Sequence, residues 1–186
     1  MNNRKRFDTR RVALIAVMAA VLCVLSPLSI PLSGGVPVSL ATLVVMLAGA
    51  VLGPVDGMLA TLTFLLLGLV GVPVFSGWQA GIGVLFGKTG GFLLGYLPLA
   101  LCSGLFRKSR LTAVSGMVLG TAVLYAFGIA WFLVLTHATL KLALTACVLP
   151  FLPGDALKIF AVCLLSPALC AALEHLGPKK ALQSPS

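Results

Sequence analysis

Two charged residues, Asp155 and Lys158, interrupt an apolar stretch in the segment LPGDALKIF. They are three positions apart, so on a helix they share one face. Ionisable groups are costly in such a stretch and are candidates for function, because a carboxylate accepts N–H donors and an ammonium meets a carbonyl or carboxylate. The alternative is structural: Pro153 and Gly154 mark a helix start, where Asp155 could cap the helix with Lys158 as its surface partner. Position alone favours neither interpretation.

A second group of candidate residues lies in the segment FSGWQAG. Trp78 offers an apolar plate and Gln79 both a donor and an acceptor, although Trp78 taken alone is more typical of an anchor at a membrane interface. Tyr96 could line a pocket, but a tyrosine that packs between helices is the commoner case. Lys88 could neutralise an anionic ligand or mark the interface, and the interface is favoured.

The glycine-rich segment GIGVLFGKTGG, residues 81–91, contains Gly87, Lys88 and Thr89 in the order found in phosphate-binding loops. The spacing does not match, because position 82, five residues before Gly87, holds isoleucine where that loop needs glycine. The sequence also contains no HExxH zinc site and no GxSxG nucleophile motif. We therefore expect neither an enzyme nor a resident cofactor or metal.

The composition is that of an integral membrane protein. Of the 186 residues 60% are apolar and 9% are charged, and the mean hydropathy is +1.14. The net charge of +9 gathers at the ends of apolar runs rather than on a basic face with interleaved aromatics, which argues against nucleic-acid binding. The basic clusters are Arg4, Lys5, Arg6, Arg10 and Arg11; Arg107, Lys108 and Arg110; and Lys179 and Lys180.

The apolar runs predict an all-α protein with six transmembrane helices in a single domain over residues 1–186. The helices are expected at about 12–29, 39–52, 55–71, 89–106, 112–135 and 154–174. Six spans place both termini and all three basic clusters on one side, which should be cytoplasmic. Segments 29–39, 72–88 and 136–153 are then outer loops, and Asp56 is expected to cap the third helix beside a cytoplasmic turn.

In the first predicted helix, Ala16 and Ala20 place small residues one turn apart. Such spacing allows another helix to approach closely. The partner could belong to another protein, or the two alanines could pack within this chain.

Four stretches, in this order, resemble the BioY family, the biotin-specific S-components of energy-coupling factor (ECF) vitamin transporters. They are VPVSLATLVVMLAGAVLGP at 36–54, LLLGLVGVPVFSG at 65–77, GKTGGFLLGY at 87–96 and LPGDALK at 152–158. The sequence departs from the family pattern at three positions. Ser39 and Ala41 replace a threonine and a glutamine, and Lys88 replaces a proline.

The resemblance implies six helices in a prokaryotic plasma membrane and a biotin site that opens to the outer face, with the glycine-rich loop as a lid. It implies docking, through Ala16 and Ala20, onto a transmembrane coupling subunit with two ATPases. Biotin would be the transported ligand rather than a cofactor. The alternatives are an S-component for another vitamin, a solitary permease, or an accessory membrane protein without a ligand.

The chemistry of biotin suits the candidate residues. The ureido ring has two N–H donors and a carbonyl for Asp155, Lys158 and Gln79, and the fused ring and tail need apolar or aromatic walls. The expected substrate-binding residues are Asp155, Lys158, Gln79, Trp78, Gly77, Phe75, Tyr96 and Ser39.

Overall fold

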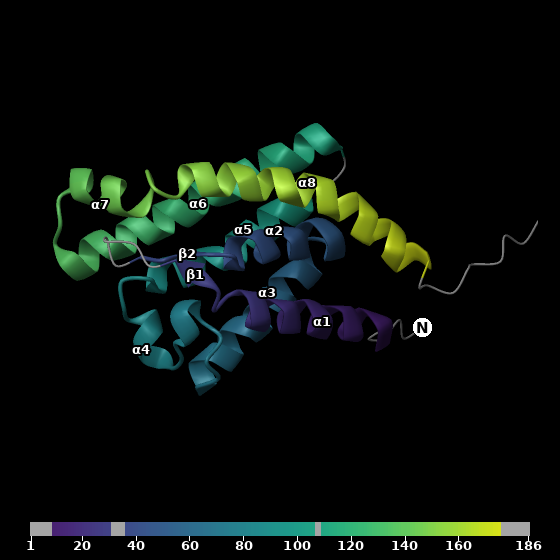
Figure 1. Cartoon of the computed structure of the whole chain (residues 1–186), viewed down its shortest axis with the longest axis horizontal. Helices are drawn as coiled ribbons and strands as arrows, with labels where there is room; N and C mark the ends of the chain where they lie inside the picture. Colours follow the sequence, from purple (N-terminus) through teal and green to yellow (C-terminus); the bar gives the residue numbers. More distant parts are fainter. Residues whose placement is uncertain (1–8, 31–35, 107–108, 176–186) are drawn as a thin grey trace, which may run out of the picture.

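The computed structural model describes residues 9–30, 36–106 and 109–175, and this part of the chain is mostly helical (Figure 1). Each of the six predicted helices has a counterpart. These are α1 (Thr9–Leu25), α2 (Ala41–Leu52), α3 (Pro54–Val70), α5 (Gly90–Leu105), α6 (Arg110–Thr136) and α8 (Leu152–His175). The segments predicted as loops contain further short elements: β1 (Ser29–Ile30), β2 (Val38–Ser39), the 3₁₀ turn η1 (Ser76–Trp78), α4 (Ile82–Leu85) and α7 (Leu140–Cys147).

The first helix ends earlier than the prediction of residue 29. It stops at Leu25, just before Ser26 and Pro27, because proline cannot continue a helix. The chain then forms β1, which pairs antiparallel with β2 so that Ser29 lies opposite Ser39. The predicted loop 29–39 therefore begins and ends in a short two-stranded ribbon, which connects α1 to α2.

Asp56 does not cap α3, so that prediction is wrong. The N-cap is Gly53, whose φ of 97° makes the tight turn from α2, and Pro54 occupies the first helical position. The Asp56 carboxylate instead accepts hydrogen bonds from Arg11 of α1, with Nε–Oδ1 and Nε–Oδ2 distances of 2.8 and 2.9 Å. This pair fastens the start of α1 to the start of α3.

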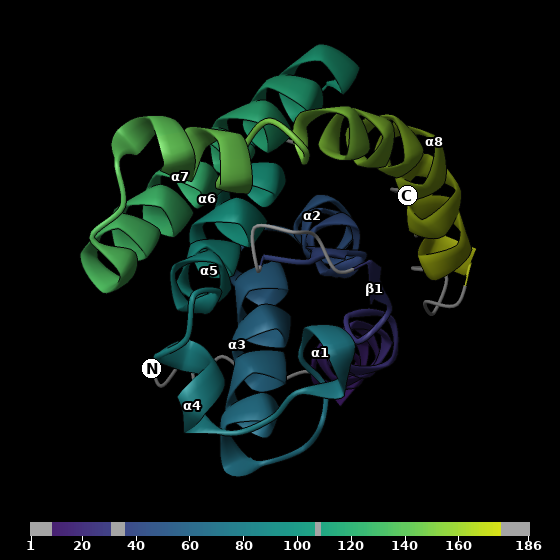
Figure 2. The same cartoon turned by 60° about the vertical axis from the view of Figure 1, so that its left-hand side comes forward.

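Helix α5 lies at the centre of the bundle, with α2, α3 and α6 around it (Figure 2). Close approach depends on glycine. A Cβ at Gly49 would lie 2.3 Å from the carbonyl oxygen of Ala100, and a Cβ at Gly91 would lie 2.4 Å from the Cβ of Trp131. Neither position can hold a larger residue without separating α5 from α2 or α6.

The start of α1 and the end of α8 lie at one end of the molecule, and β1, β2, α4 and α7 lie at the other (Figure 1). At the first end Arg10 donates a hydrogen bond to the carbonyl oxygen of Leu173. We call the second end, which contains the ribbon and the short helices, the loop end. The predicted outer loops 29–39, 72–88 and 136–153 all begin or end there.

Two helices in the described part of the chain are long and apolar enough to cross a membrane, α6 over Leu111–Thr136 and α8 over Leu152–Leu173. Helices α2, α3 and α5 are apolar but shorter. Only 11% of the most apolar window of α8 is buried within the protein. An apolar helix this exposed is unlike the core helix of a water-soluble protein and fits a lipid environment.

Candidate ligand-binding site

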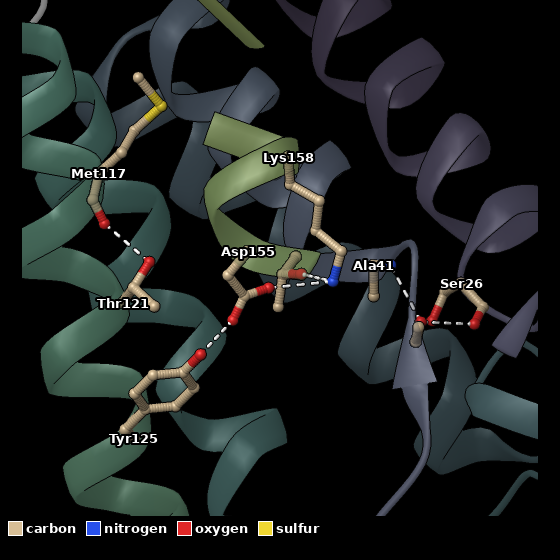
Figure 3. Close-up of polar contacts among 9 residues, drawn as sticks. Ser26, Ala41, Met117, Thr121, Tyr125, Asp155 and Lys158 are labelled. Carbon is tan, nitrogen blue, oxygen red and sulfur yellow. Dashed lines mark hydrogen bonds and ion pairs between the residues drawn. The ribbon is translucent and has the colours of Figure 1, made fainter. Parts of the chain in front are cut away.

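Three helices bring four polar side chains together in the interior, three of which are labelled in Figure 3. The Tyr125 hydroxyl of α6 donates to Oδ2 of Asp155 at 2.5 Å. The Lys158 ammonium of α8 donates to Oδ1 of Asp155 at 3.0 Å and to the Thr42 hydroxyl of α2 at 2.8 Å. Both carboxylate oxygens and the ammonium thus have partners, and we call these four residues the buried polar network.

Asp155 is only 3% exposed and Lys158 only 7%. A charge so deeply buried costs several kcal/mol unless it is paired and hydrogen-bonded, as these two are. The structure also argues against the alternative of a helix cap with a surface partner. Helix α8 begins at Leu152, and the backbone N–H of Asp155 already donates to the carbonyl of Phe151 at 2.8 Å. Asp155 therefore lies in the first turn of the helix rather than at its cap, and Lys158 is not at the surface.

A cavity lies against this network. Its lining residues are Val36, Pro37, Ser39, Thr42, Phe75, Ser76, Gln79, Val84, Thr89, Phe92, Leu93, Tyr96, Leu124, Tyr125, Phe151, Asp155 and Lys158. Apolar walls with a few convergent polar groups are typical of small-molecule sites. The space that the centre of a water-sized sphere can occupy inside the cavity is about 40 Å³. In this conformation the cavity therefore has room for only a few water molecules.

Six of the eight predicted binding residues line this cavity, and two do not. Those on the lining are Asp155, Lys158, Gln79, Phe75, Tyr96 and Ser39. Trp78 is 64% exposed and, like Gly77, is absent from the lining.

The backbone explains this division. Phe75 and Gln79 form an isolated antiparallel bridge, in which the Phe75 N–H donates to the Gln79 carbonyl at 3.0 Å. The tight loop between them has positive φ at both Gly77 (70°) and Trp78 (62°), and it turns the Trp78 side chain outwards. At its base the Phe75 ring packs edge-on against Phe64, with 5.7 Å between ring centroids. Phe75 and Gln79 are thereby held on the cavity wall.

Ser39 is at the cavity, but its hydroxyl already has two partners. It donates to the Ser26 carbonyl at 2.9 Å and accepts from the Ala41 N–H at 2.9 Å (Figure 3). Ser39 therefore links the end of α1 to the start of α2. This bond fixes the first turn of α2, which carries Thr42 of the buried polar network.

Sequence reasoning missed Tyr125 and Thr42. Tyr125 is one of only two tyrosines in the chain, and both line the cavity. A hydroxyl-bearing aromatic within the long apolar segment VLYAFG was the available signal. The stacked pair Phe92 and Phe151, with centroids 6.2 Å apart, was also missed, and an isolated phenylalanine in an apolar run gives no such signal.

Ala16 and Ala20 are both exposed on α1, whereas their neighbour Ala19 is buried. The two small residues therefore do not serve packing within the described part of this chain. They form a free surface on α1, which we call the α1 alanine face.

A buried ion pair, a cavity walled by several helices and an exposed apolar α8 are features of a membrane-embedded protein with a candidate small-molecule site. Comparison with known proteins gives the family: the model of the BioY family matches residues 1–175, and the chain belongs to that family. It is 42% identical over 166 residues to the biotin transporter BioY of Rhodobacter capsulatus, covering 81% of this chain and 87% of that protein. It is 38% identical to the biotin transporter BioY2 of Lactococcus lactis, covering 94% and 96%.

The fold agrees with a solved structure. The crystal structure of the S-component for biotin from an ECF-type ABC transporter superposes with a TM-score of 0.81 and 26% sequence identity. The match covers 91% of this chain and 94% of that one. The likeness therefore extends over nearly the whole chain rather than over a shared pair of helices.

Proposed function

We propose that this chain is the biotin-binding S-component of an ATP-driven ECF uptake transporter. It would capture biotin at the outer face and deliver it through a partner coupling subunit with two ATPases. Support comes from its family and from relatives named as biotin transporters. The single observation that carries the site is the buried polar network on the cavity wall.

We further propose that helices α1, α2, α3, α5, α6 and α8 span a prokaryotic plasma membrane as one domain, with both termini in the cytoplasm. The loop end then faces outwards. The cavity residues Gln79 and Thr89 lie on either side of α4 in the chain, and α4 lies at that end (Figure 1). The apolar character of α6 and α8 supports this arrangement. So do the basic clusters, since positive residues favour the cytoplasmic side.

In this proposal the ureido ring of biotin meets the buried polar network. Asp155 would accept ureido N–H groups, and Lys158 would donate to the ureido carbonyl. Gln79 could do either from the opposite loop. Analogues without the ureido group should bind poorly, because each buried polar group left unpaired costs about 1–3 kcal/mol.

Calorimetric titration of biotin into the purified, detergent-solubilised protein tests the proposal, with thiamin and riboflavin as controls. We expect heat of binding with biotin alone. Binding of thiamin or riboflavin instead would indicate an S-component for another vitamin. Folded protein that gives neither heat nor thermal stabilisation with biotin would contradict the biotin assignment.

The cavity must enlarge to hold biotin, because it now has room for only a few water molecules. We expect segment 76–89, which forms part of the cavity wall, to move and then to close over the bound biotin. Trp78, exposed on this segment, should then move into a less polar environment. We expect its fluorescence emission to shift to shorter wavelength when biotin is added. The shift should be absent in Trp78→Phe, which retains Trp131 as the other tryptophan. An unchanged emission at saturating biotin would show that Trp78 takes no part in closure.

The α1 alanine face is the proposed contact with the coupling subunit. Ala20→Trp should block close approach of a partner helix and leave the cavity intact, because Ala20 is exposed and is not part of the cavity lining. We expect normal biotin binding by purified protein, but a fall in biotin uptake of about tenfold or more in cells that also express the coupling module, because uptake requires the docked complex. Leu164→Trp, at a residue of α8 that is 63% exposed, is the matched control and should retain uptake. Equal uptake by both variants would remove Ala20 from the interface.

A further inference from the structure

A second hollow adjoins the cavity at the loop end. It measures about 510 Å³ on the same scale as the cavity and includes Lys88 in its lining. Three residues, Gln79, Val84 and Thr89, line both spaces. A ligand that extends from the buried polar network past these three residues, with segment 76–89 displaced to admit it, would therefore reach the space beside Lys88.

The distribution of charge distinguishes the two spaces. In the cavity the Lys158 ammonium is already neutralised by Asp155, 3.0 Å away. A ligand carboxylate placed there would lie beside the Asp155 carboxylate in a buried site, and like charges so close repel strongly. The inner end of the cavity thus favours the uncharged end of a ligand.

Lys88 offers the opposite environment. It is exposed, and it takes part in neither the Arg11–Asp56 nor the Lys158–Asp155 ion pair found among residues 9–30, 36–106 and 109–175. It also directly precedes Thr89, the N-cap of α5, where the helix dipole adds to the attraction for an anion. The second hollow is therefore the favourable place for a negative charge.

We propose that Lys88 binds the carboxylate of biotin in the second hollow, while the ureido ring lies against Asp155. Lys88 would then determine specificity: it favours the free acid over uncharged esters or amides of the same ring and tail. The inference rests on the proposed biotin function, and it assigns the carboxylate end of biotin to Lys88 and the ureido end to the site of Asp155 and Lys158.

The test compares the affinities of biotin and of biotinamide, which lacks the negative charge, for the full-length protein and for Lys88→Met. We expect the wild type to prefer biotin about fivefold at low salt, the size of a favourable exposed ion pair. Lys88→Met should lose this preference through weaker biotin binding, with the affinity for biotinamide unchanged. Lys88→Arg should retain it. Lys141→Met removes another exposed lysine of the loop end and should behave as wild type.

An equal preference in the wild type and Lys88→Met would overturn the proposal, as would an equal loss of affinity for both ligands. A second measurement needs no variant: the preference of the wild type for biotin should shrink as salt is raised from about 0.01 M to 1 M, because the contact is exposed. A preference independent of salt would also overturn it. If the wild type binds biotin tightly and any of these results is found, only the role of Lys88 is wrong. If the wild type does not bind biotin at all, the proposed function itself is wrong.

Discussion

Replacing Asp155 by asparagine should weaken biotin binding at least tenfold, a loss of about 1.4 kcal/mol or more. The carboxylate accepts from Tyr125 and from Lys158 while only 3% exposed, and in the proposed complex it also accepts from the ureido ring. Asparagine keeps the shape but places an NH₂ group where one acceptor was and leaves Lys158 without its counter-charge. Calorimetric titration of the purified variant measures the change.

Loss of folding could imitate this result, because removal of one partner from a buried ion pair destabilises a protein by about 3–5 kcal/mol. The thermal unfolding of Asp155→Asn should therefore be measured beside its biotin affinity. Asp56→Asn is the matched control: it breaks the pair with Arg11 at the other end of the molecule and should leave biotin affinity unchanged. Unchanged affinity in folded Asp155→Asn would remove Asp155 from the site.

The double variant Asp155→Asn, Lys158→Met separates the two roles of the pair. Removing both charges relieves the unpaired buried ammonium, so stability should recover relative to Asp155→Asn. Biotin affinity should stay low, because the ureido ring has lost both the Asp155 acceptor and the Lys158 donor. Recovery of stability without recovery of binding would assign the Asp155–Lys158 pair to ligand recognition rather than to folding alone.

The long helices could be predicted from the sequence because apolar runs and their breakers are local signals. Helix α1 ends at Leu25, two positions before Pro27, and α2 ends at Leu52, two positions before Pro54. Helix α7 could not be predicted in this way, because its eight residues are too few for a span. Its start depends on Thr139, whose hydroxyl accepts from the Leu142 N–H.

The site was only partly predictable, because side-chain direction depends on backbone geometry that the sequence does not show. Asp155 and Lys158 stand out as rare charges in an apolar run, whereas the outward turn of Trp78 follows from its positive φ. Tyr125 lies on α6, 30 positions before Asp155 in the chain, so no local spacing in the sequence links the two residues. The pairing of distant residues required the packed bundle.

Tyr125→Phe should weaken biotin binding by up to about tenfold, close to 1.4 kcal/mol. The hydroxyl donates to Oδ2 of Asp155 at 2.5 Å, and its loss leaves a buried acceptor without that donor, which costs about 1–3 kcal/mol. The carboxylate would also be free to turn away from the position that the ureido ring requires. Titration of biotin into the variant measures the effect, and the ring itself is retained, so the cavity wall keeps its shape.

Thr121→Val is the control on the same helix. Thr121 is also buried, one turn before Tyr125, but its hydroxyl donates to the Met117 carbonyl within α6 and does not reach Asp155 (Figure 3). Its removal should therefore change stability slightly and biotin affinity very little. If the two variants lost affinity equally, the effect of Tyr125 would be one of general packing. A loss confined to Tyr125→Phe, and absent when Tyr125→Phe is added to Asp155→Asn, would show that the hydroxyl acts through the carboxylate, because the two changes then share one interaction.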